Sequence, residues 1–280
     1  MSGQRLDKEL VSRGLVSSRT RAAQLISAGQ VRVNGAAVTK PSASVSADAQ
    51  ISVQDQDPWV SRAAHKLLGA LEAFDDVVVA GRRCLDAGAS TGGFTQVLLS
   101  AGAAEVTAVD VGHGQLVDSL RQDPRVTDRE GLNLRHIAPG DLGEPFSLIV
   151  ADLSFISLRL VLGPLRDQAA ASADLLLMVK PQFEIGRERL SRTGVVTSAQ
   201  LRQEAVFGVV TEALDLGLEF RGAVRSPLPG QDGNAEFFLH LRAPETPQAE
   251  AATPRPRAAE KKSALPSHVS DRLEAVRYAD

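Results

Sequence analysis

The sequence predicts an α/β protein: a Rossmann-like domain with a doubly wound, mostly parallel sheet, preceded by a small α+β domain. From residue 61 onward, short apolar runs typical of buried strands alternate with helical patterns, and this alternation is typical of a parallel sheet with helices on both faces. Nearer the start, helical spacing gives way to apolar–polar alternation around Asn34-Gly35, which is a strong hairpin signal.

The first 56 residues predict a compact module. Apolar residues at helical spacing indicate two short helices within 5–28. Alternating apolar and polar residues then indicate a hairpin over 30–38 and a third strand over 49–53. The polar stretch Asp55-Gln-Asp-Pro58 ends in a helix-breaking proline. We therefore place the first domain at 1–56 and a linker at 57–60.

The second domain, 61–242, alternates helices and strands in the manner of a Rossmann-like sheet. Helical periodicity predicts helices over 63–74, 93–100, 158–170 and 198–216. Apolar runs bounded by turn residues predict strands over 83–87, 105–110, 146–151, 175–179, 219–224 and 236–241. Large apolar residues become rare beyond Arg242, so we expect 243–280 to be a disordered tail, with a transient helix over 268–277.

Composition sets the class of protein. With 43% hydrophobic and 23% charged residues, the chain has the composition of a globular protein, which excludes a wholly disordered or collagen-like chain. Its apolar runs are far shorter than the roughly 20 residues that cross a bilayer, and its start is polar, so we expect no membrane span, no signal peptide and a cytoplasmic location. The single cysteine, Cys84, excludes an internal disulfide and a cysteine-based zinc site, and we expect no metal.

The run Cys84-Leu-Asp-Ala-Gly-Ala-Ser-Thr-Gly-Gly-Phe94 is the most informative segment. A strand ends there, a turn of small residues follows and a helix begins at once, an arrangement that lets the backbone approach a ligand. The next predicted strand ends in Asp110, where an acid can accept hydrogen bonds from a ribose diol. The run is neither a Gly-x-Gly-x-x-Gly motif nor a phosphate loop, and it resembles the S-adenosylmethionine loop of Rossmann-like methyltransferases.

That resemblance implies S-adenosylmethionine as the cofactor. The backbones of Gly88, Ser90 and Gly92 are expected near its methionine moiety, and Asp110 near its ribose hydroxyls. Further cofactor residues are expected in the same loop, namely Asp86, Thr91, Gly93 and Phe94, and two more, Glu130 and Asn133, are expected near the adenine.

Four charged residues stand where charge is unexpected. Asp152 and Lys180 each follow a hydrophobic strand, Lys66 lies on an apolar-faced helix, and Glu236 precedes two phenylalanines of the last strand. Because the carboxyl ends of parallel strands meet at one edge of a sheet, we expect these side chains to share one cleft. Lys180 and Asp152 are predicted to lie within hydrogen-bond or salt-bridge range of each other, facing the pocket above Gly88.

In their order along the chain, these four residues resemble the lysine–aspartate–lysine–glutamate tetrad of FtsJ-like RNA ribose 2'-O-methyltransferases. The chain is similar in particular to the TlyA family, which carries an S4-type RNA-binding module ahead of such a domain. The matching segments run in family order: Arg5-Leu-Asp, Ser18-Arg-Thr-Arg21, Ala28–Gly35, Ser61–Lys66, Leu85–Phe94, Ala151–Ser157, Val179–Glu184, Ser226-Pro and Gly233–Glu236.

The resemblance implies methylation of cytidine ribose in 16S and 23S ribosomal RNA, because a full N-terminal helix is expected in members that act on both. The ribose hydroxyl must lose its proton as the methyl group transfers. A lysine accepts a proton only when it is neutral, which burial and a second nearby cation favour. We assign Lys180 as the base or hydroxyl activator, Asp152 as the group that orients it and the methyl sulfonium, and Lys66 and Glu236 as orienting partners.

Basic charge is concentrated near the start of the chain. Residues 1–56 carry 7 Lys and Arg against 4 Asp and Glu, whereas 57–242 carry 18 against 24, which favours a polyanion as the partner of the first domain. That domain has no aromatic residue, so recognition of RNA shape or backbone is expected rather than base stacking. The RNA-binding candidates are arginines, whose planar side chains suit phosphate: Arg5, Arg13, Arg19, Arg21 and Arg32, with Arg62 in the following helix.

The same residues disfavour two other classes of enzyme. A pseudouridine synthase can carry the same first module but lacks the loop 86–94, and amino-directed methyltransferases have prolines where this chain has Asp152-Leu-Ser-Phe155. Two alternatives stay open: a membrane-active haemolysin, a name attached to this family, and a non-catalytic rRNA-binding assembly factor. The haemolysin alternative finds no amphipathic or membrane-spanning segment of adequate length in the sequence. The assembly-factor alternative predicts that loss of Lys180 does not change the function of the protein. The sequence leaves the oligomeric state and the target nucleotides open.

Overall fold

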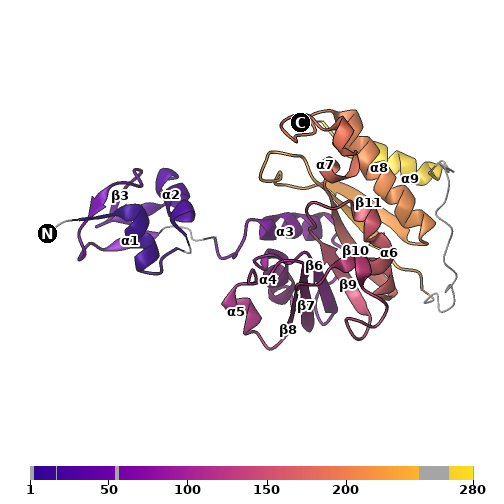
Figure 1. Cartoon of the computed structure of the whole chain (residues 1–280), viewed down its shortest axis with the longest axis horizontal. Helices are drawn as coiled ribbons and strands as arrows, with labels where there is room; N and C mark the ends of the chain where they lie inside the picture. The colour runs from indigo at the N-terminus through magenta and orange to yellow at the C-terminus, as the bar shows by residue number, and fades with distance from the viewer. Residues whose placement is uncertain (1–2, 17, 54–56, 246–264, 280) are drawn as a thin grey trace. The chain divides into compact units, whose positions relative to one another are not determined.

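The computed structural model describes residues 3–16, 18–53, 57–245 and 265–279. The chain divides into two compact units, Met1–Pro58 and Trp59–Asp280, which are coloured from indigo to yellow along the chain in Figure 1. Each unit has its own hydrophobic core.

The N-terminal unit packs two helices against short antiparallel strands. Its elements are β1 (Gln4–Arg5), α1 (Leu6–Ser12), α2 (Arg19–Ser27), β2 (Val31–Val33), β3 (Ala36–Ala37), β4 (Ser44–Val45) and β5 (Ile51–Val53). Strands β3, β2 and β5 form one sheet, and β1 pairs with β4. The predicted hairpin turn is confirmed, because Asn34 and Gly35 both adopt a positive φ between β2 and β3. The pair β1–β4 was not predicted, since strands of two residues show no alternation.

The C-terminal unit is built on one mixed sheet. Its strands are β6 (Arg83–Ala87), β7 (Glu105–Asp110), β8 (Val126–Glu130), β9 (Phe146–Ala151), β10 (Ala169–Val179), β11 (Glu219–Arg225) and β12 (Phe237–Arg242). The seven strands follow the order β11-β12-β10-β9-β6-β7-β8. Neighbours from β10 to β8 are parallel, whereas β12 is antiparallel to both β10 and β11. The predicted Rossmann-like, mostly parallel sheet is therefore confirmed.

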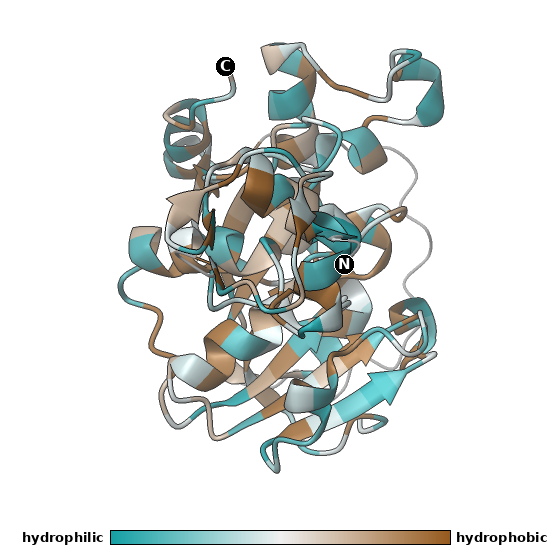
Figure 2. Ribbon diagram, turned by 90° about the vertical axis from the view of Figure 1, so that its left-hand side faces the viewer, coloured by the Kyte–Doolittle hydropathy of each residue, from teal (hydrophilic) through white to brown (hydrophobic). Residues whose placement is uncertain are grey.

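Helices cover both faces of this sheet. One core contains α3 (Ala63–Ala73), α4 (Gly93–Ser100) and α5 (Asp118–Arg121), and the other contains α6 (Leu162–Asp167), α8 (Ala199–Asp215) and α9 (Ser267–Glu274). The described residues of this unit also form the short helices α7 (Pro181–Glu184), η1 (Leu134–His136), η2 (Leu158–Leu160) and η3 (Arg187–Arg189). Because side chains alternate along a strand, Leu177 and Met178 enter opposite cores. Figure 2 shows hydrophobic residues gathered on the inner strands and hydrophilic residues toward the periphery.

The sheet brings sequence-distant residues to one edge. Strands β6, β7, β9 and β10 all end at the same side, as parallel neighbours must. Strand β12 runs the other way, so its first residue, Phe237, pairs with Val179, the last residue of β10. Glu236, which precedes β12, therefore lies at the edge where Lys180 follows β10.

Most predicted elements are found close to their expected bounds. The helix expected over 158–170 is instead divided between η2 and α6, and β10 begins earlier than predicted, with an irregular register between Ala169 and Asp174. Strand β8 and the short helices α5 and α7 were not predicted. Strand β8 has the sequence Val-Thr-Asp-Arg-Glu and lies at the sheet edge, where polar residues need no apolar partner.

The prediction of a disordered tail over 243–280 is wrong for 243–245 and 265–279, whereas the helix expected over 268–277 is found as α9 (Ser267–Glu274). Helix α9 packs into the core of the C-terminal unit through Val269 and Leu273, one helical turn apart, and Tyr278 is also buried there. Because only a few apolar residues hold α9 against the domain, the composition of the segment does not reveal that it is folded. The remainder of the predicted tail, from 246 to 264, lies outside the described residues.

Candidate functional site

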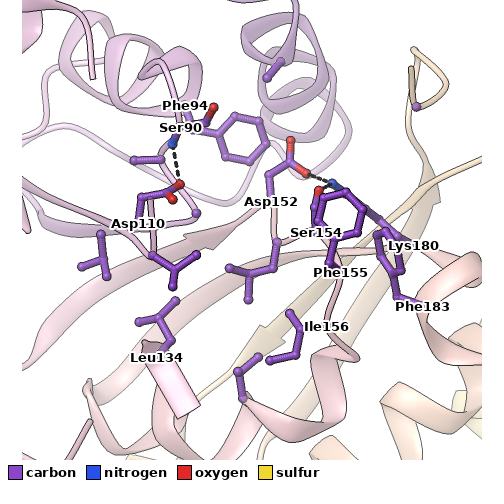
Figure 3. A pocket seen from close by; sticks show the side chains of 18 of the residues that line it. Ser90, Phe94, Asp110, Leu134, Asp152, Ser154, Phe155, Ile156, Lys180 and Phe183 are labelled. Atoms are coloured by element: carbon purple, nitrogen blue, oxygen red, sulfur yellow. Dashed lines mark hydrogen bonds and ion pairs between the residues drawn. The ribbon is translucent and has the colours of Figure 1, made fainter. Parts of the chain in front are cut away.

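A cavity of about 1010 Å³ opens at the carboxyl edge of the parallel strands. Its walls come from α3, from the loops that follow β6, β7, β9 and β10, and from the loop before β12. Figure 3 shows Lys180 reaching toward Asp152 at one side of the cavity, and Ser90 with Asp110 at the other. This is the edge at which the sequence predicted a ligand site.

The loop after β6 is shaped for close backbone approach. Gly88 has a φ of +89°, and a Cβ atom there would lie 2.9 Å from the carbonyl oxygen of Asp152. Ser90 also has a positive φ, +47°, and its N–H donates to Asp110 Oδ2 at 2.9 Å. Asp110 Oδ1 accepts from the N–H of Gly112 at 2.7 Å. The Asp110 carboxylate, which is predicted to bind a ribose, thus also fixes the backbone of two loops, the one after β6 and the one after β7.

The structure separates the predicted cofactor residues into two groups. Those that line the cavity are Gly88, Ser90, Thr91, Gly93, Phe94, Asp110 and Asn133. Asp86, Gly92 and Glu130 lie outside the lining. The carboxylate of Glu130 accepts hydrogen bonds from the backbone N–H groups of Gly114, Gln115 and Leu116, so its contacts shape the loop after β7 rather than the cavity wall.

Asp86 is a buried acid behind the loop. Its side chain is fully buried, Oδ2 accepts from the Thr95 hydroxyl at 2.7 Å, and Oδ1 has no hydrogen-bond partner among the described residues. Burial raises the pKa of Asp86 to about 7. The site therefore holds an acid that changes charge near neutral pH.

We predict that Asp86 makes stability fall as pH rises from about 4 to about 7. In this window the unfolded chain has released the proton, because the ordinary pKa of aspartate is about 4, while the folded chain retains it. The free energy of unfolding should fall by on the order of 4 kcal/mol across the window and level off above it. Urea unfolding without ligand at a series of pH values measures this, with Asp86→Asn expected to flatten the slope and the exposed Asp118→Asn to leave it. A slope that is equal in wild type and Asp86→Asn would contradict the prediction.

The four tetrad residues converge at the opposite wall. Lys180 Nζ lies 2.6 Å from Asp152 Oδ1 and donates to Ser154 Oγ at 2.8 Å. Lys66 Nζ lies 2.6 Å from Glu236 Oε2 and 4.0 Å from Asp152 Oδ2. Lys66, Lys180 and Glu236 are buried, and all four residues line the cavity. The predicted geometry is confirmed: Lys180 and Asp152 are paired, in the cavity that Gly88 also lines.

The pairing changes one part of the expected chemistry. The sequence predicts repulsion between Lys66 and Lys180, but the structure gives each lysine its own carboxylate, with Asp152 between them. Two lysines and two carboxylates leave the cluster without net charge. The attraction to the carboxylates therefore offsets the repulsion that was expected between the lysines.

Among the cavity residues that the sequence did not predict, Ser154 and Phe155 stand out. Ser154 accepts the hydrogen bond from Lys180, and Phe155 is 91% exposed with a φ of +65°. The Phe155 ring lies 5.5 Å from that of Phe183, and both rings line the cavity. A non-glycine residue held at positive φ with an exposed aromatic ring is uncommon and marks a candidate functional site. The signal that could have found them is their position, since they lie two and three residues after Asp152.

The arginines of the N-terminal unit fall into distinct environments. Arg5 and Arg19 both pair with the buried carboxylate of Asp7, at 2.9 Å each, and their own side chains are about half exposed. The Arg5 guanidinium holds the pKa of Asp7 well below its usual range. Arg13 instead donates to the carbonyl groups of Ala47 and Ala49, which gives it a structural role. Arg5 and Arg19 thus form a fixed, exposed pair.

Among the remaining predicted arginines, Arg21 and Arg32 are partly exposed and Arg62 is exposed. Arg21 lies in the first turn of α2 and is partly exposed. Arg32 donates to the carbonyl of Gly35, next to the hairpin turn. Arg62 belongs to the C-terminal unit, lines the cavity and donates to the carbonyl of Pro229 at 2.6 Å.

Comparison with known proteins gives consistent matches. Residues 59–243 match the FtsJ-like methyltransferase family, and residues 4–51 match the S4 domain. The chain is 53% identical over 240 residues to the 16S/23S rRNA (cytidine-2'-O)-methyltransferase TlyA of Mycobacterium tuberculosis, which covers 85% of this chain and 89% of that protein. It is 36% identical over 183 residues to the 23S rRNA (cytidine-2'-O)-methyltransferase TlyA of Campylobacter jejuni, covering 65% and 70%.

A solved structure extends the likeness to the fold. A protein from Streptococcus thermophilus with a provisional hemolysin name is 36% identical, with a TM-score of 0.69 over 90% of this chain and 93% of that chain. Within the described part of this chain, no helix is both long enough and apolar enough to cross a membrane.

Proposed function

The chain belongs to the TlyA family of FtsJ-like methyltransferases, and we propose that it methylates the 2'-hydroxyl of cytidine riboses in 16S and 23S ribosomal RNA. Membership makes it a methyltransferase that uses S-adenosylmethionine. The choice of RNA is supported by the relative at 53% identity, which is named for both rRNAs, and by the S4 domain at 4–51. Both ribosomal subunits are then substrates, and the reaction takes place in the cytoplasm, where they are assembled.

One observation carries the proposal: Lys180 and Asp152 are 2.6 Å apart on the wall of the cavity that Gly88 lines. A lysine paired with a carboxylate beside the cofactor loop can bind a hydroxyl and accept its proton. A ribose hydroxyl is a weak nucleophile that must lose its proton during transfer, so it needs such a group. The pair therefore supports ribose as the methyl acceptor.

The residues present fit S-adenosylmethionine. The cofactor carries an ammonium group and a sulfonium, and Asp86 Oδ1 is a buried acceptor that lacks a donor within the described chain. Gly88 leaves open the space that a Cβ atom would fill, and the Asp110 carboxylate lines the cavity where a ribose diol can donate to it. Bound in this cavity, S-adenosylmethionine supplies an electrophilic methyl group.

The chain's own residues then carry out the rest. Lys180 accepts a hydrogen bond from the 2'-hydroxyl when its amine is neutral, and receives the proton as the hydroxyl oxygen attacks. Asp152 holds the Lys180 amine in place and stabilises the ammonium that forms. Lys66 and Glu236, paired at 2.6 Å, orient Asp152 from the other side. Positioning of the hydroxyl in line with the methyl group contributes a large part of the rate.

RNA is recognised first through its backbone. Arg5 and Arg19 present two guanidinium groups that Asp7 holds in place, and such fixed forks suit phosphate oxygens. Arg21, Arg32 and Arg62 extend the proposed contacts. Arg13 is left out because its donors are used by backbone carbonyls.

Transfer of tritiated methyl groups from S-adenosylmethionine to purified ribosomal subunits tests the function. Unmodified small and large subunits should both take up label from the wild type, and the labelled positions should resist alkaline hydrolysis, because a 2'-O-methyl group removes the nucleophile for strand cleavage. Subunits that are already modified serve as the control. Label on a base, or tight RNA binding with no transfer, would overturn the proposal in favour of base methylation or of an assembly factor.

We further predict that Phe155→Ala lowers kcat/KM for RNA by about 10- to 100-fold, with unchanged affinity for S-adenosylmethionine. The exposed ring at the cavity wall is placed to stack on a base turned out of the RNA, and such stacking contributes about 1–3 kcal/mol per base. Steady-state kinetics with subunits and calorimetry with the cofactor measure the two quantities. The control is Val78→Ala, which removes an exposed apolar side chain outside the cavity lining. Equal losses in both variants would show that Phe155 has no special role.

A further inference from the structure

The segment 265–279 lies beyond both regions that match known families, yet it packs closely on the methyltransferase domain. Figure 1 shows α9, in yellow, beside α8 and β11. Val269, Leu273 and Tyr278 are 2%, 0% and 7% exposed. The segment is therefore part of the folded domain, and its contacts can be followed toward the site.

The first contact is a buried arginine on α8. Arg202 is 2% exposed; its Nε donates to the carbonyl of Val196 and its Nη1 to the carbonyl of Tyr278, both at 2.8 Å. A buried cation needs its hydrogen bonds, because leaving a charged donor unsatisfied is costly. Arg202 therefore joins the C-terminal segment to the loop before α8.

A second set of hydrogen bonds joins the loop before α8 to Asn234, in the loop before β12. Asn234, 2% exposed, accepts from the N–H of Val196 at 2.8 Å and donates to the carbonyl of Gly194 at 3.1 Å. Its own carbonyl accepts from the N–H of Gly230 at 2.9 Å. Val196 thus bonds Arg202 through its carbonyl and Asn234 through its N–H. The path now reaches the loop that precedes β12.

The path ends at Glu236. A Cβ atom on Gly230 would lie 2.7 Å from Glu236 Oε1, so this loop backbone packs directly against the carboxylate. A shorter route reaches the same place, because the Tyr278 ring lies 5.2 Å from the ring of Phe237, the next residue. Two routes therefore lead from Tyr278 to Glu236: one starts at its carbonyl and passes through Arg202, and the other starts at its ring and passes through Phe237.

We propose that Arg202, Asn234 and Tyr278 are positioning residues for the tetrad, and that the docked C-terminal segment holds Glu236 against Lys66. The proposal rests on the proposed function, since Glu236 belongs to the proposed site. When Glu236 is displaced, Lys66 loses its partner at 2.6 Å and turns to Asp152, already 4.0 Å away. Asp152 is then shared between two lysines and no longer holds Lys180 alone.

The test compares three variants of the full chain with a matched control. Asn234→Ala breaks the path, Tyr278→Ala removes the ring contact, and a double variant, Val269→Asp with Leu273→Asp, releases α9 from the core. The control is Arg272→Ala, on the exposed side of α9. Each is assayed for methyl transfer to ribosomal subunits, for binding of S-adenosylmethionine by calorimetry, and for hydrogen exchange by mass spectrometry.

We expect kcat to fall by about 10- to 100-fold in the three variants, the range that follows from misplacing a reacting group by about 1 Å. KM for RNA and Kd for S-adenosylmethionine should stay within about twofold. Amides of 230–236 should exchange faster, and those of 86–94 should not change. The control should match the wild type in every measurement.

Two results would overturn the inference. In the first, the wild type methylates RNA and the variants keep its kcat. In the second, KM and Kd rise with the fall in kcat and exchange increases over the whole domain, which is the signature of general destabilisation. If the wild type transfers no methyl group, the proposed function fails instead, and exchange over 230–236 alone decides whether the C-terminal segment orders that loop.

Discussion

Replacing Lys180 by alanine is expected to lower kcat for methyl transfer by about 10³-fold or more, while the affinities for S-adenosylmethionine and RNA stay within about threefold. Lys180 is buried at the cavity wall, 2.6 Å from Asp152 Oδ1 and 2.8 Å from Ser154 Oγ. A positioned acid or base contributes about 10²–10⁴-fold, and its loss here also leaves Asp152 without its closer cation. Single-turnover transfer to ribosomal subunits measures the rate without product release.

Two control variants separate proton transfer from charge. Lys180→Arg keeps the positive charge, but a guanidinium does not give up its proton in proteins, so it is expected to be as inactive as Lys180→Ala. Arg221→Ala removes an exposed charge on edge strand β11 and should behave as the wild type. An active Lys180→Arg enzyme would show that Lys180 acts through charge alone, and an active Lys180→Ala enzyme would exclude it from the reaction.

Replacing Gly88 by alanine is expected to abolish measurable binding of S-adenosylmethionine. A side chain at a φ of +89° costs about 1–2 kcal/mol, and the new Cβ atom would also lie 2.9 Å from the Asp152 carbonyl. The loop after β6 and the segment that carries Asp152 must then move apart, so the cofactor cradle and the tetrad are disturbed together. Calorimetric titration with S-adenosylmethionine and thermal unfolding report the two effects.

Gly140→Ala is the matched control for backbone strain. Gly140 has a φ of +87° with no atom within 4 Å of the added Cβ, so it carries the same strain without the close contact. It should lower thermal stability and leave cofactor binding intact. If Gly88→Ala binds S-adenosylmethionine as tightly as Gly140→Ala does, the loop after β6 does not form the cradle.

The sequence predicted best the features that depend on local pattern and on sheet edges. Asp152 and Lys180 could be placed together because each follows an apolar strand, and parallel strands end at one edge. Glu130, expected near the adenine, lies outside the cavity lining, and nothing in the sequence shows that its carboxylate is used by backbone N–H groups of the preceding loop. The same holds for Arg13, whose partners are carbonyl groups about 35 residues away.

The docking of 265–279 could not be predicted for a different reason. Helix α9 contributes only two buried apolar residues, Val269 and Leu273, which composition does not distinguish from a solvated helix. Its contact depends on the surface that α8 and β11 present, and on the buried Arg202 guanidinium, which donates to the carbonyl of Tyr278. Such complementarity exists only in three dimensions.

The position of β12 has a consequence for the timing of folding. This strand inserts between β10 and β11, and the residue before it, Glu236, pairs with Lys66, 170 positions earlier in the chain. Contacts between residues so far apart in the sequence form late in folding, because the chain must first lose the entropy of the long loop between them. During synthesis, the cofactor loop after β6 can therefore fold on the emerging parallel strands well before the tetrad is complete. A nascent chain is expected to gain cofactor affinity first and the capacity for methyl transfer only when its last strand has been released from the ribosome that makes it.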